Sequence, residues 1–172
     1  MRQKWPKPVL GLAGYSGSGK TSLLCQLLPL LKQRDLRVSV IKHSHHEILL
    51  DKPGKDSHRL FNSGANEVIL ACPQQRYHFS QQHQSEQLEQ QLQWVQWQQC
   101  DLVLVEGYRE SNIDKIEVHR PALGKALLYP NDPNIIALSC NEALNAPLPV
   151  LDLNQASQVL DFIIDYLSQI SE

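Results

Sequence analysis

The stretch PVLGLAGYSGSGKTSLLCQLL, residues 8–28, decides the fold of this chain. Its first part, residues 8–14, is a short apolar run that ends in glycine, as is typical of a buried strand in a parallel sheet. Apolar residues recur at helical spacing from Leu23 onward, so a helix is expected next. The segment between them, GYSGSGKT at 14–21, fits the pattern G-x-x-x-x-G-K-S/T, in which a glycine-rich loop holds phosphate.

The loop at 14–21 has the chemistry that a phosphate site requires. Its glycines permit backbone turns that bulkier residues resist, so the N–H groups of residues 17–21 can point inward around a phosphate. The helix that begins there adds the positive end of its dipole. We predict that Lys20 reaches the β- and γ-phosphates, that the Thr21 hydroxyl binds magnesium, and that Ser22 lies on the α-phosphate side. The predicted nucleotide-binding residues of the loop are Gly14, Gly17, Ser18, Gly19, Lys20, Thr21 and Ser22.

A second predicted part of the site is an acid at the end of a strand. DLVLVEG, residues 101–107, is the clearest buried strand of the chain, and Glu106 follows its apolar run. Ligands of open α/β sheets bind outside the carboxyl ends of the strands, so Glu106 is expected beside the phosphate loop. We therefore predict that Glu106 helps to hold magnesium, at a position where aspartate is more usual.

The rest of the chain alternates strands with helices. This alternation predicts the α/β class, as a P-loop NTPase three-layer fold with a mainly parallel sheet, and a single nucleotide-binding domain over residues 1–172. Twelve glutamines fall in residues 74–99, yet Leu88, Leu92 and Val95 keep helical spacing there. Further strands are predicted at 36–44, 67–72, 76–80, 115–119 and 134–140, and helices at 21–34, 56–65, 85–99 and 154–170.

A long polar connection, HSHHEILLDKPGKDSHRL at residues 43–60, joins a strand to a helix. In a compact domain such a connection is more often functional than idle. Asp56 is either the N-cap of the following helix or a second magnesium ligand. Lys52 and Lys55 either neutralise phosphates or face the solvent.

Composition limits the class of protein. A chain of 172 residues that is 42% hydrophobic can bury about 70% of the surface it exposes when unfolded. The net charge of −2 argues against a strongly basic nucleic-acid binder, but residues 1–86 carry +6 and residues 87–172 carry −8. Either the first half handles an anion, or the charges form an uneven solvated surface. No apolar run reaches the roughly 20 residues of a membrane span, and the start lacks the apolar core of a secretory signal. We therefore expect a cytoplasmic protein.

The cysteines indicate neither a metal site nor a redox motif. They are far apart and form no C-x-x-C pair. Each lies in or beside an apolar segment, where cysteine behaves as a small hydrophobe. We expect buried, reduced thiols at Cys25, Cys72, Cys100 and Cys140.

Taken together, these motifs resemble the MobB family of molybdopterin-guanine dinucleotide biosynthesis adapter proteins. The resemblance covers nearly the whole chain and rests on GYSGSGKT at 14–21, IKHSHHE at 41–47, DKPGKDSHRLFNSGA at 51–65 and DLVLVEGYR at 101–109. Many NTPases share the phosphate loop, whereas KH-x-HH and DKPGKDS at this spacing are far more specific. The resemblance implies a dimeric SIMIBI-type P-loop domain that binds GTP with Mg²⁺, hydrolyses it weakly and acts mainly as an adapter.

The resemblance also implies partners and site residues. The expected partners are molybdopterin and the molybdenum cofactor guanylyltransferase, which attaches GMP to it; neither nucleic acid nor a membrane is expected. The magnesium site of the family carries over to Thr21 and Glu106, with Asp56 as a further ligand. Contacts with the nucleotide or the pterin cofactor carry over to Lys42, His43, Asp51, Lys52 and Lys55.

The sequence departs from many GTPases in its guanine-reading segment. The pattern N-K-x-D is absent, and the corresponding strand end reads ALSCNEAL at 137–144, so Asn141 or backbone groups are left to read the base. No catalytic residue is assigned, although Arg109 follows Glu106 closely. Slow hydrolysis is expected, because an arginine contact can raise the rate of phosphoryl transfer by several powers of ten.

Two other functions remain open. The chain could be a P-loop small-molecule kinase or ligase, with an acceptor site formed by residues 43–58. It could also be a nickel-insertion GTPase, because His43 and His45 share one face if their strand continues, although histidines equally serve as hydrogen-bonding groups. Nickel-insertion relatives usually carry a cysteine–histidine metal motif and N-K-x-D, and neither is present here.

Overall fold

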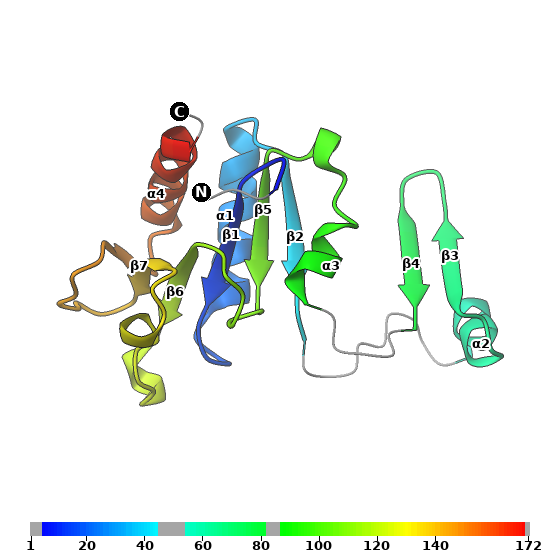
Figure 1. Ribbon diagram of the computed structural model, residues 1–172, viewed down its shortest axis with the longest axis horizontal. Coiled ribbons are helices and arrows are strands. Elements are labelled where there is room, and N and C mark those ends of the chain that lie inside the picture. Colours follow the sequence, from blue (N-terminus) through cyan, green and yellow to red (C-terminus); the bar gives the residue numbers. More distant parts are fainter. Residues whose placement is uncertain (1–4, 45–53, 82–86, 171–172) are drawn as a thin grey trace. The chain divides into compact units, whose positions relative to one another are not determined.

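A computed structural model describes residues 5–44, 54–81 and 87–170 of the chain. They form two compact units (Figure 1). The first unit comprises Met1–His43 and Gln87–Glu172, and the second comprises Ser44–Glu86. The expectation of a single domain over residues 1–172 stays a prediction. Asp51, Lys52, His45 and His46 lie outside the described residues.

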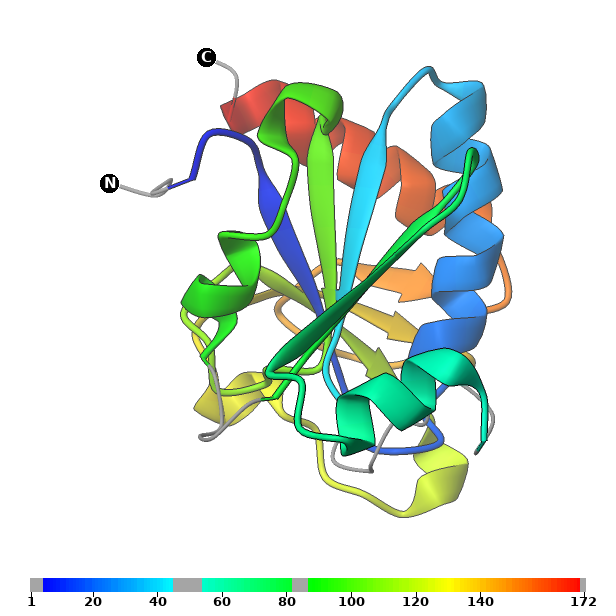
Figure 2. The ribbon, with the colours of Figure 1, turned by 90° about the vertical axis from the view of Figure 1, so that its right-hand side faces the viewer.

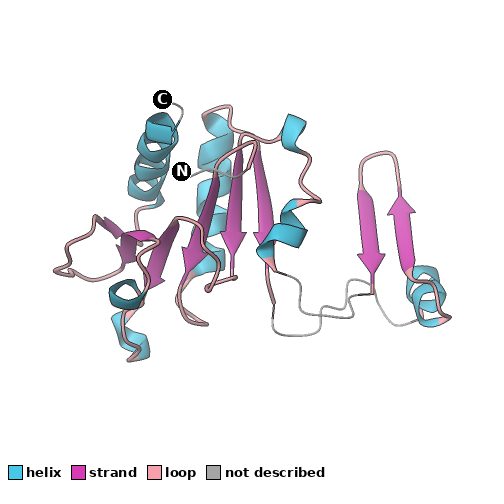
Figure 3. Cartoon of the chain, in the orientation of Figure 1, coloured by secondary structure: helices cyan, strands magenta, loops and turns pink. Residues whose placement is uncertain are grey.

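A six-stranded parallel sheet is the centre of the first unit (Figure 3). The strand order β2-β5-β1-β6-β7-β8 places the strand of the phosphate loop, β1, in the interior of the sheet. All five pairings are parallel, so the carboxyl ends of the strands meet at one edge. The α/β class and the parallel sheet are thereby confirmed, whereas β8 was not predicted. The strands are β1 Val9–Ala13, β2 Val38–Lys42, β5 Leu102–Glu106, β6 Lys115–His119, β7 Ile135–Cys140 and β8 Val150–Asp152.

Two helices cover one face of this sheet, α1 (Lys20–Gln33) and α4 (Ala156–Ile170) (Figure 2). Leucines at helical spacing on α1 and Val159 and Ile163 on α4 are buried against the sheet. Each such side chain contributes about 1.5–3 kcal/mol by leaving water. This packing fixes the start of α1, and with it the end of the phosphate loop.

The opposite face is covered by short helical pieces, which corrects the prediction of one helix over 85–99. The structure has α3 at Leu88–Leu92 and a 3₁₀ turn at Trp97–Gln99. The first and last residues of α3, Leu88 and Leu92, are buried. Trp94, by contrast, is 64% exposed, and the chain bends before Trp97. Trp97 then stacks on Trp5, with ring centroids 6.3 Å apart. This tertiary contact overrides the helical spacing of the sequence.

The second unit contains one helix and one hairpin. The helix α2, Asp56–Asn62, ends before Gly64, which has a φ of 107°. Strands β3, Glu67–Ala71, and β4, Arg76–Ser80, pair antiparallel. Both strands and the helix were predicted, and the helix is shorter than the expected 56–65.

Two further predictions concern the cysteine thiols and membrane-spanning helices. Cys100 and Cys140 are buried, but Cys25 and Cys72 are exposed, so the prediction of four buried thiols was wrong for two of them. Cys25 lies on the solvent side of an amphipathic helix, which apolar neighbours in sequence do not reveal. Among the described residues, no helix is both long and apolar enough to cross a membrane.

An ion pair at the start of β2 and β5 predicts a pH effect on stability. Arg37 donates from Nε and Nη2 to the Asp101 carboxylate at 2.9 and 2.7 Å, and these bonds hold the pKa of Asp101 well below its ordinary value. The stability they contribute is present above the unfolded pKa of about 3.9 and is lost as the pH falls below it. Urea unfolding at pH 6 and pH 3 should show a smaller loss for Asp101→Asn than for the wild type. The control Asp161→Asn, which removes the exposed 3.9 Å pair with Arg34, should follow the wild type. Equal losses in all three would contradict the assignment.

Candidate functional site

The phosphate loop joins β1 to α1 and needs glycine at two places. Gly14 has a φ of 144°, and a Cβ there would lie 2.4 Å from the carbonyl oxygen of Val118 on β6. Gly19, with a φ of 102°, is the N-cap of α1. The first turn of α1 carries no acidic residue, so no side chain of the helix itself offsets the positive end of its dipole. A loop of this shape leaves an electropositive cradle suited to phosphate.

Lys20 is half-buried at the start of α1 and curls back over the loop. Its Nζ donates to the carbonyl oxygens of Gly14 and Tyr15, at 2.9 and 2.8 Å. Burial lowers the pKa of Lys20; the carboxylate of Glu106 opposes this shift and the charge of Lys42 adds to it. The ammonium group is therefore held at the loop, no carboxylate of the described residues is bonded to it, and it remains available to an anion.

Thr21, Lys42 and Glu106 meet at the carboxyl edge of the sheet. Thr21 Oγ1 donates to Glu106 Oε1 at 2.7 Å, and Lys42 Nζ donates to Thr21 Oγ1 at 3.0 Å. Lys42 Nζ also lies 3.3 Å from Glu106 Oε1, because β2 and β5 pair these two residues side by side. Glu106 is buried. The Thr21 hydroxyl and the Glu106 carboxylate oxygen thus already share one cation, the Lys42 ammonium group. Such an oxygen pair fits Mg²⁺, which prefers oxygen ligands.

His43 lies beside this cluster. Its backbone N–H donates to the Glu106 carbonyl at 2.8 Å, and its ring stacks on Tyr108 with the centroids 4.5 Å apart. Gly107 makes this packing feasible, since a Cβ there would lie 2.8 Å from His43 Cβ. The structure thus brings His43 next to the predicted magnesium side of the site.

The other predicted residues are spread over both units. Ser18 is buried in the loop, and Ser22 is exposed on α1. Lys55 and Asp56 belong to the second unit, where the Asp56 side chain is 96% exposed and lies 3.9 Å from Arg59. The N-cap of α2 is Lys55, so the interpretation of Asp56 as the N-cap was wrong. The predicted contacts of Lys55 and Asp56, and those of Asp51 and Lys52 outside the described residues, stay predictions. Within residues 5–44, 54–81 and 87–170, no three His, Cys, Asp or Glu side chains gather as a metal site would require.

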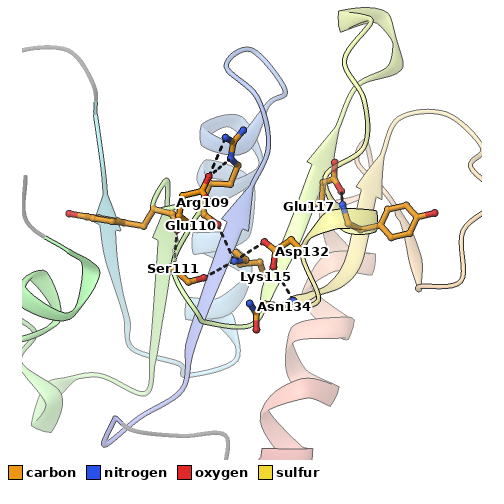
Figure 4. Close-up of polar contacts among 9 residues, drawn as sticks. Arg109, Glu110, Ser111, Lys115, Glu117, Asp132 and Asn134 are labelled. Carbon is orange, nitrogen blue, oxygen red and sulfur yellow. Dashed lines mark hydrogen bonds and ion pairs between the residues drawn. The ribbon is translucent and has the colours of Figure 1, made fainter.

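No pattern in the sequence pointed to Lys115, which the structure buries at the start of β6 (Figure 4). Its Nζ donates to the carbonyl oxygens of Arg109 and Ser111, at 3.1 and 2.7 Å, and lies 2.8 Å from Asp132 Oδ2. Gly11 on β1 leaves room for it, because a Cβ there would lie 2.7 Å from Lys115 Cγ. Lys115 therefore fixes the turn that follows Glu106. The glycine opposite a lysine in an adjacent strand is the only sequence signal that could have indicated it.

Arg120, directly after β6, is a second residue that the sequence did not single out. Its Nε donates to the Ser18 carbonyl at 3.0 Å. Gly19 admits the guanidinium group, since a Cβ there would lie 3.3 Å from Nε and from Nη2. On the other flank of the loop, Arg109 lies over the Tyr15 ring, with Cζ 5.9 Å from its centroid. The phosphate loop is thus bordered by arginines on two sides.

The sequence matches a family and two named relatives over most of its length. The model of the family MobB, molybdopterin guanine dinucleotide synthesis protein B, matches residues 9–141. The molybdopterin-guanine dinucleotide biosynthesis adapter protein of Haemophilus influenzae is 42% identical over 161 residues, which are 93% of this chain and 89% of that protein. Its Escherichia coli counterpart is 35% identical over 168 residues, 94% of each chain.

Solved structures share the fold. A crystal structure of molybdopterin-guanine biosynthesis protein B superposes with a TM-score of 0.72 at 26% identity, covering 92% of this chain and 99% of the other. Bacillus subtilis MobB gives a TM-score of 0.73 at 20% identity, covering 93% and 98%. The P-loop NTPase-like arrangement of strands and helices is therefore one that these proteins have in common.

Proposed function

This chain belongs to the MobB family and has the adapter role in molybdopterin guanine dinucleotide biosynthesis, and we propose that it performs this role as a GTP-binding protein. In this proposal it binds GTP with Mg²⁺, hydrolyses it weakly, and assists the guanylyltransferase that attaches GMP to molybdopterin. The family membership rests on the match over residues 9–141 and on relatives with 42% and 35% identity.

The observation that carries nucleotide binding is the 2.7 Å bond between Thr21 and Glu106 at the start of α1. Together with the adjacent Lys42 ammonium it provides oxygen ligands and a cation site directly beside the phosphate loop. When bound, Mg²⁺ would neutralise charge on the phosphates, held by the Thr21 hydroxyl and the Glu106 carboxylate. Lys20 and the loop N–H groups would bind the phosphates, and Lys42 would add a second positive charge.

Weak hydrolysis agrees with the surroundings of Arg109. Its guanidinium lies over Tyr15 and pairs with Glu110 at 3.3 Å, in an exposed position rather than against the loop N–H groups. An arginine that stabilises the transition state is worth about 10³–10⁵ in rate. An Arg109 that is held in this way by Tyr15 and Glu110 suits an adapter whose nucleotide state signals to a partner. The proposed assembly is a homodimer that contacts the guanylyltransferase and molybdopterin.

The direct test measures binding to nucleotides and to the transferase. Isothermal calorimetry of the full chain with GTP and ATP, each with Mg²⁺, should show GTP bound more tightly. Affinity capture with the purified guanylyltransferase should then give a complex in at least one of the GTP, GDP and nucleotide-free states. Tighter binding of ATP would overturn the guanine assignment, and the absence of a complex in all three states would overturn the partnership. Rapid ATP turnover that requires a small acceptor would instead indicate a kinase.

Replacing Glu106 by glutamine should weaken the response to magnesium. The change keeps the shape of the side chain but removes the charge that faces the cation, so half-saturation of GTP binding should need about tenfold more Mg²⁺. Binding of GTP without Mg²⁺ should change little. Magnesium titrations at fixed GTP measure this, with Glu110→Gln, at a 90% exposed side chain, as the matched control. Identical titration curves for both variants would count against Glu106 as a ligand.

A further inference from the structure

The order of the strands sets the direction in which a bound nucleotide extends. Glu106 and Lys42 are the last residues of β5 and β2, which lie on one side of β1, whereas β6 and β7 lie on the other side. A nucleotide with its magnesium and terminal phosphates beside Glu106 therefore directs its nucleoside toward the ends of β6 and β7. The residues that follow these two strands are the candidates for contact with the base.

Arg120 is fixed at this place by the phosphate loop itself. Its Nε is bonded to the Ser18 carbonyl, and its guanidinium lies against Gly19. One hydrogen-bonding position of the side chain is thereby used and its orientation is set. Within the described part of the chain, no hydrogen bond or ion pair engages its Nη groups, which keep their donors for a ligand.

The segment 120–129, which Arg120 opens, approaches the phosphate loop at two places. Leu123 lies 3.8 Å from the position of a Cβ at Gly17, and Lys125 Nζ lies 6.0 Å from the Tyr15 ring centroid. The far end of the segment is held by the fully buried Glu117, whose carboxylate accepts from the N–H groups of residues 128 and 129 at 2.8 and 2.9 Å. The segment 120–129 is therefore held at both ends, by the bond from Arg120 to Ser18 and by the bonds to Glu117.

Asn141 supplies a second, independent observation at the same edge. The register pairs His119 with Cys140, so the residues that follow, Arg120 and Asn141, leave neighbouring strands at the same level. Asn141 Oδ1 is buried and has no hydrogen-bond partner among the described residues. A buried acceptor without a partner is costly, and it is satisfied when a ligand donor reaches it.

We infer that Arg120 recognises the guanine base of the bound nucleotide, with Asn141 as the neighbouring acceptor. Guanine presents two acceptors, O6 and N7, on one edge, and the arginine fork matches them with two donors. Adenine presents an amino donor in place of O6, which an arginine donor cannot satisfy. This pairing explains how the chain selects GTP although N-K-x-D is absent, and it rests on the proposed binding of GTP.

The test compares the affinities for GTP and ATP in Arg120→Gln and in the wild type. Losing the two-donor contact should lower the GTP-to-ATP affinity ratio by about 5- to 150-fold. Loss of the bond to Ser18 would weaken both nucleotides equally and leave the ratio unchanged, so the ratio separates recognition from support of the loop. Arg34→Gln, on the exposed end of α1, is the matched control and should keep the wild-type ratio.

A second measurement needs no variant. The wild-type chain should bind 7-deaza-GTP, in which C–H replaces N7, at least several-fold more weakly than GTP. Equal binding of the two nucleotides, or an unchanged GTP-to-ATP ratio in folded Arg120→Gln, would overturn the role of Arg120 while GTP binding stands. A wild-type chain that does not prefer GTP over ATP would instead overturn the proposed function, and this inference with it.

Discussion

Lys20→Ala should lower the affinity for GTP about 100-fold or more while the chain stays folded. The Lys20 ammonium now donates to two carbonyl oxygens of the loop, and in a complex it would form charged hydrogen bonds to the phosphates. Each such bond is worth roughly 1.5–3 kcal/mol, so the loss of two corresponds to at least this factor. Calorimetry with GTP and Mg²⁺ measures the affinity, and thermal unfolding verifies the fold.

The control for this change is Lys32→Ala, which removes an exposed lysine near the other end of the same helix. It should bind GTP like the wild type, because it lies beyond the reach of the phosphate loop. If Lys20→Ala kept its affinity within a few-fold of Lys32→Ala, the loop at 14–21 would not be the nucleotide site.

Lys115→Met should destabilise the protein by about 3–5 kcal/mol, the largest stability change that we expect from any single charge. The substitution keeps an apolar stem but leaves Asp132 and two carbonyl oxygens without their donor. Burial acts to raise the pKa of Asp132, but the hydrogen bonds from Lys115 and from the Asn134 N–H outweigh it and keep the pKa low. Without Lys115 the Asp132 carboxylate would keep its burial but lose the charged partner that offsets it. Urea unfolding with linear extrapolation measures the change.

Two further variants show whether the loss comes from the ion pair. Lys32→Met is the matched exposed change and should stay within about 0.5 kcal/mol of the wild type. In a double-mutant cycle, Asp132→Asn should cost less in the Lys115→Met background than alone, because the pair is then already broken. Additive losses, or a loss from Lys115→Met no larger than that from Lys32→Met, would show that the buried pair has no such role.

Much of the fold could be predicted because local signals agreed with the tertiary structure. The apolar run before Gly14 and the helical spacing after Lys20 required a strand, a turn and a helix in that order. Likewise the run 102–105 predicted an interior strand with Glu106 at its end, and the structure pairs that strand with β1. A strand buried on both faces needs no partner information to be recognised, since its apolar residues are continuous.

Other features could not be predicted because distant contacts decide them. The bend between α3 and Trp97 follows from stacking on Trp5, about ninety positions away in the chain. On β6 the alternation of charged and apolar residues is typical of a strand with one face in water, yet the structure buries all of Lys115–His119. The covering segments supply carbonyl and N–H groups to the buried charges, and no local pattern indicates that pairing.

The sequence by itself determined the glycine-rich turn at 14–21 between strand and helix, the α/β class and the acid at the end of β5, because each depends on residues that are neighbours in the chain. The tertiary structure alone decided that Lys42 lies against Thr21 and Glu106, and that Arg120 lies against the loop. Both contacts arise where parallel strands end side by side, and the strand order that makes them neighbours is a property of the sheet. Position along the chain therefore predicts the phosphate side of the site, and the packing of the strands supplies its proposed base-reading side.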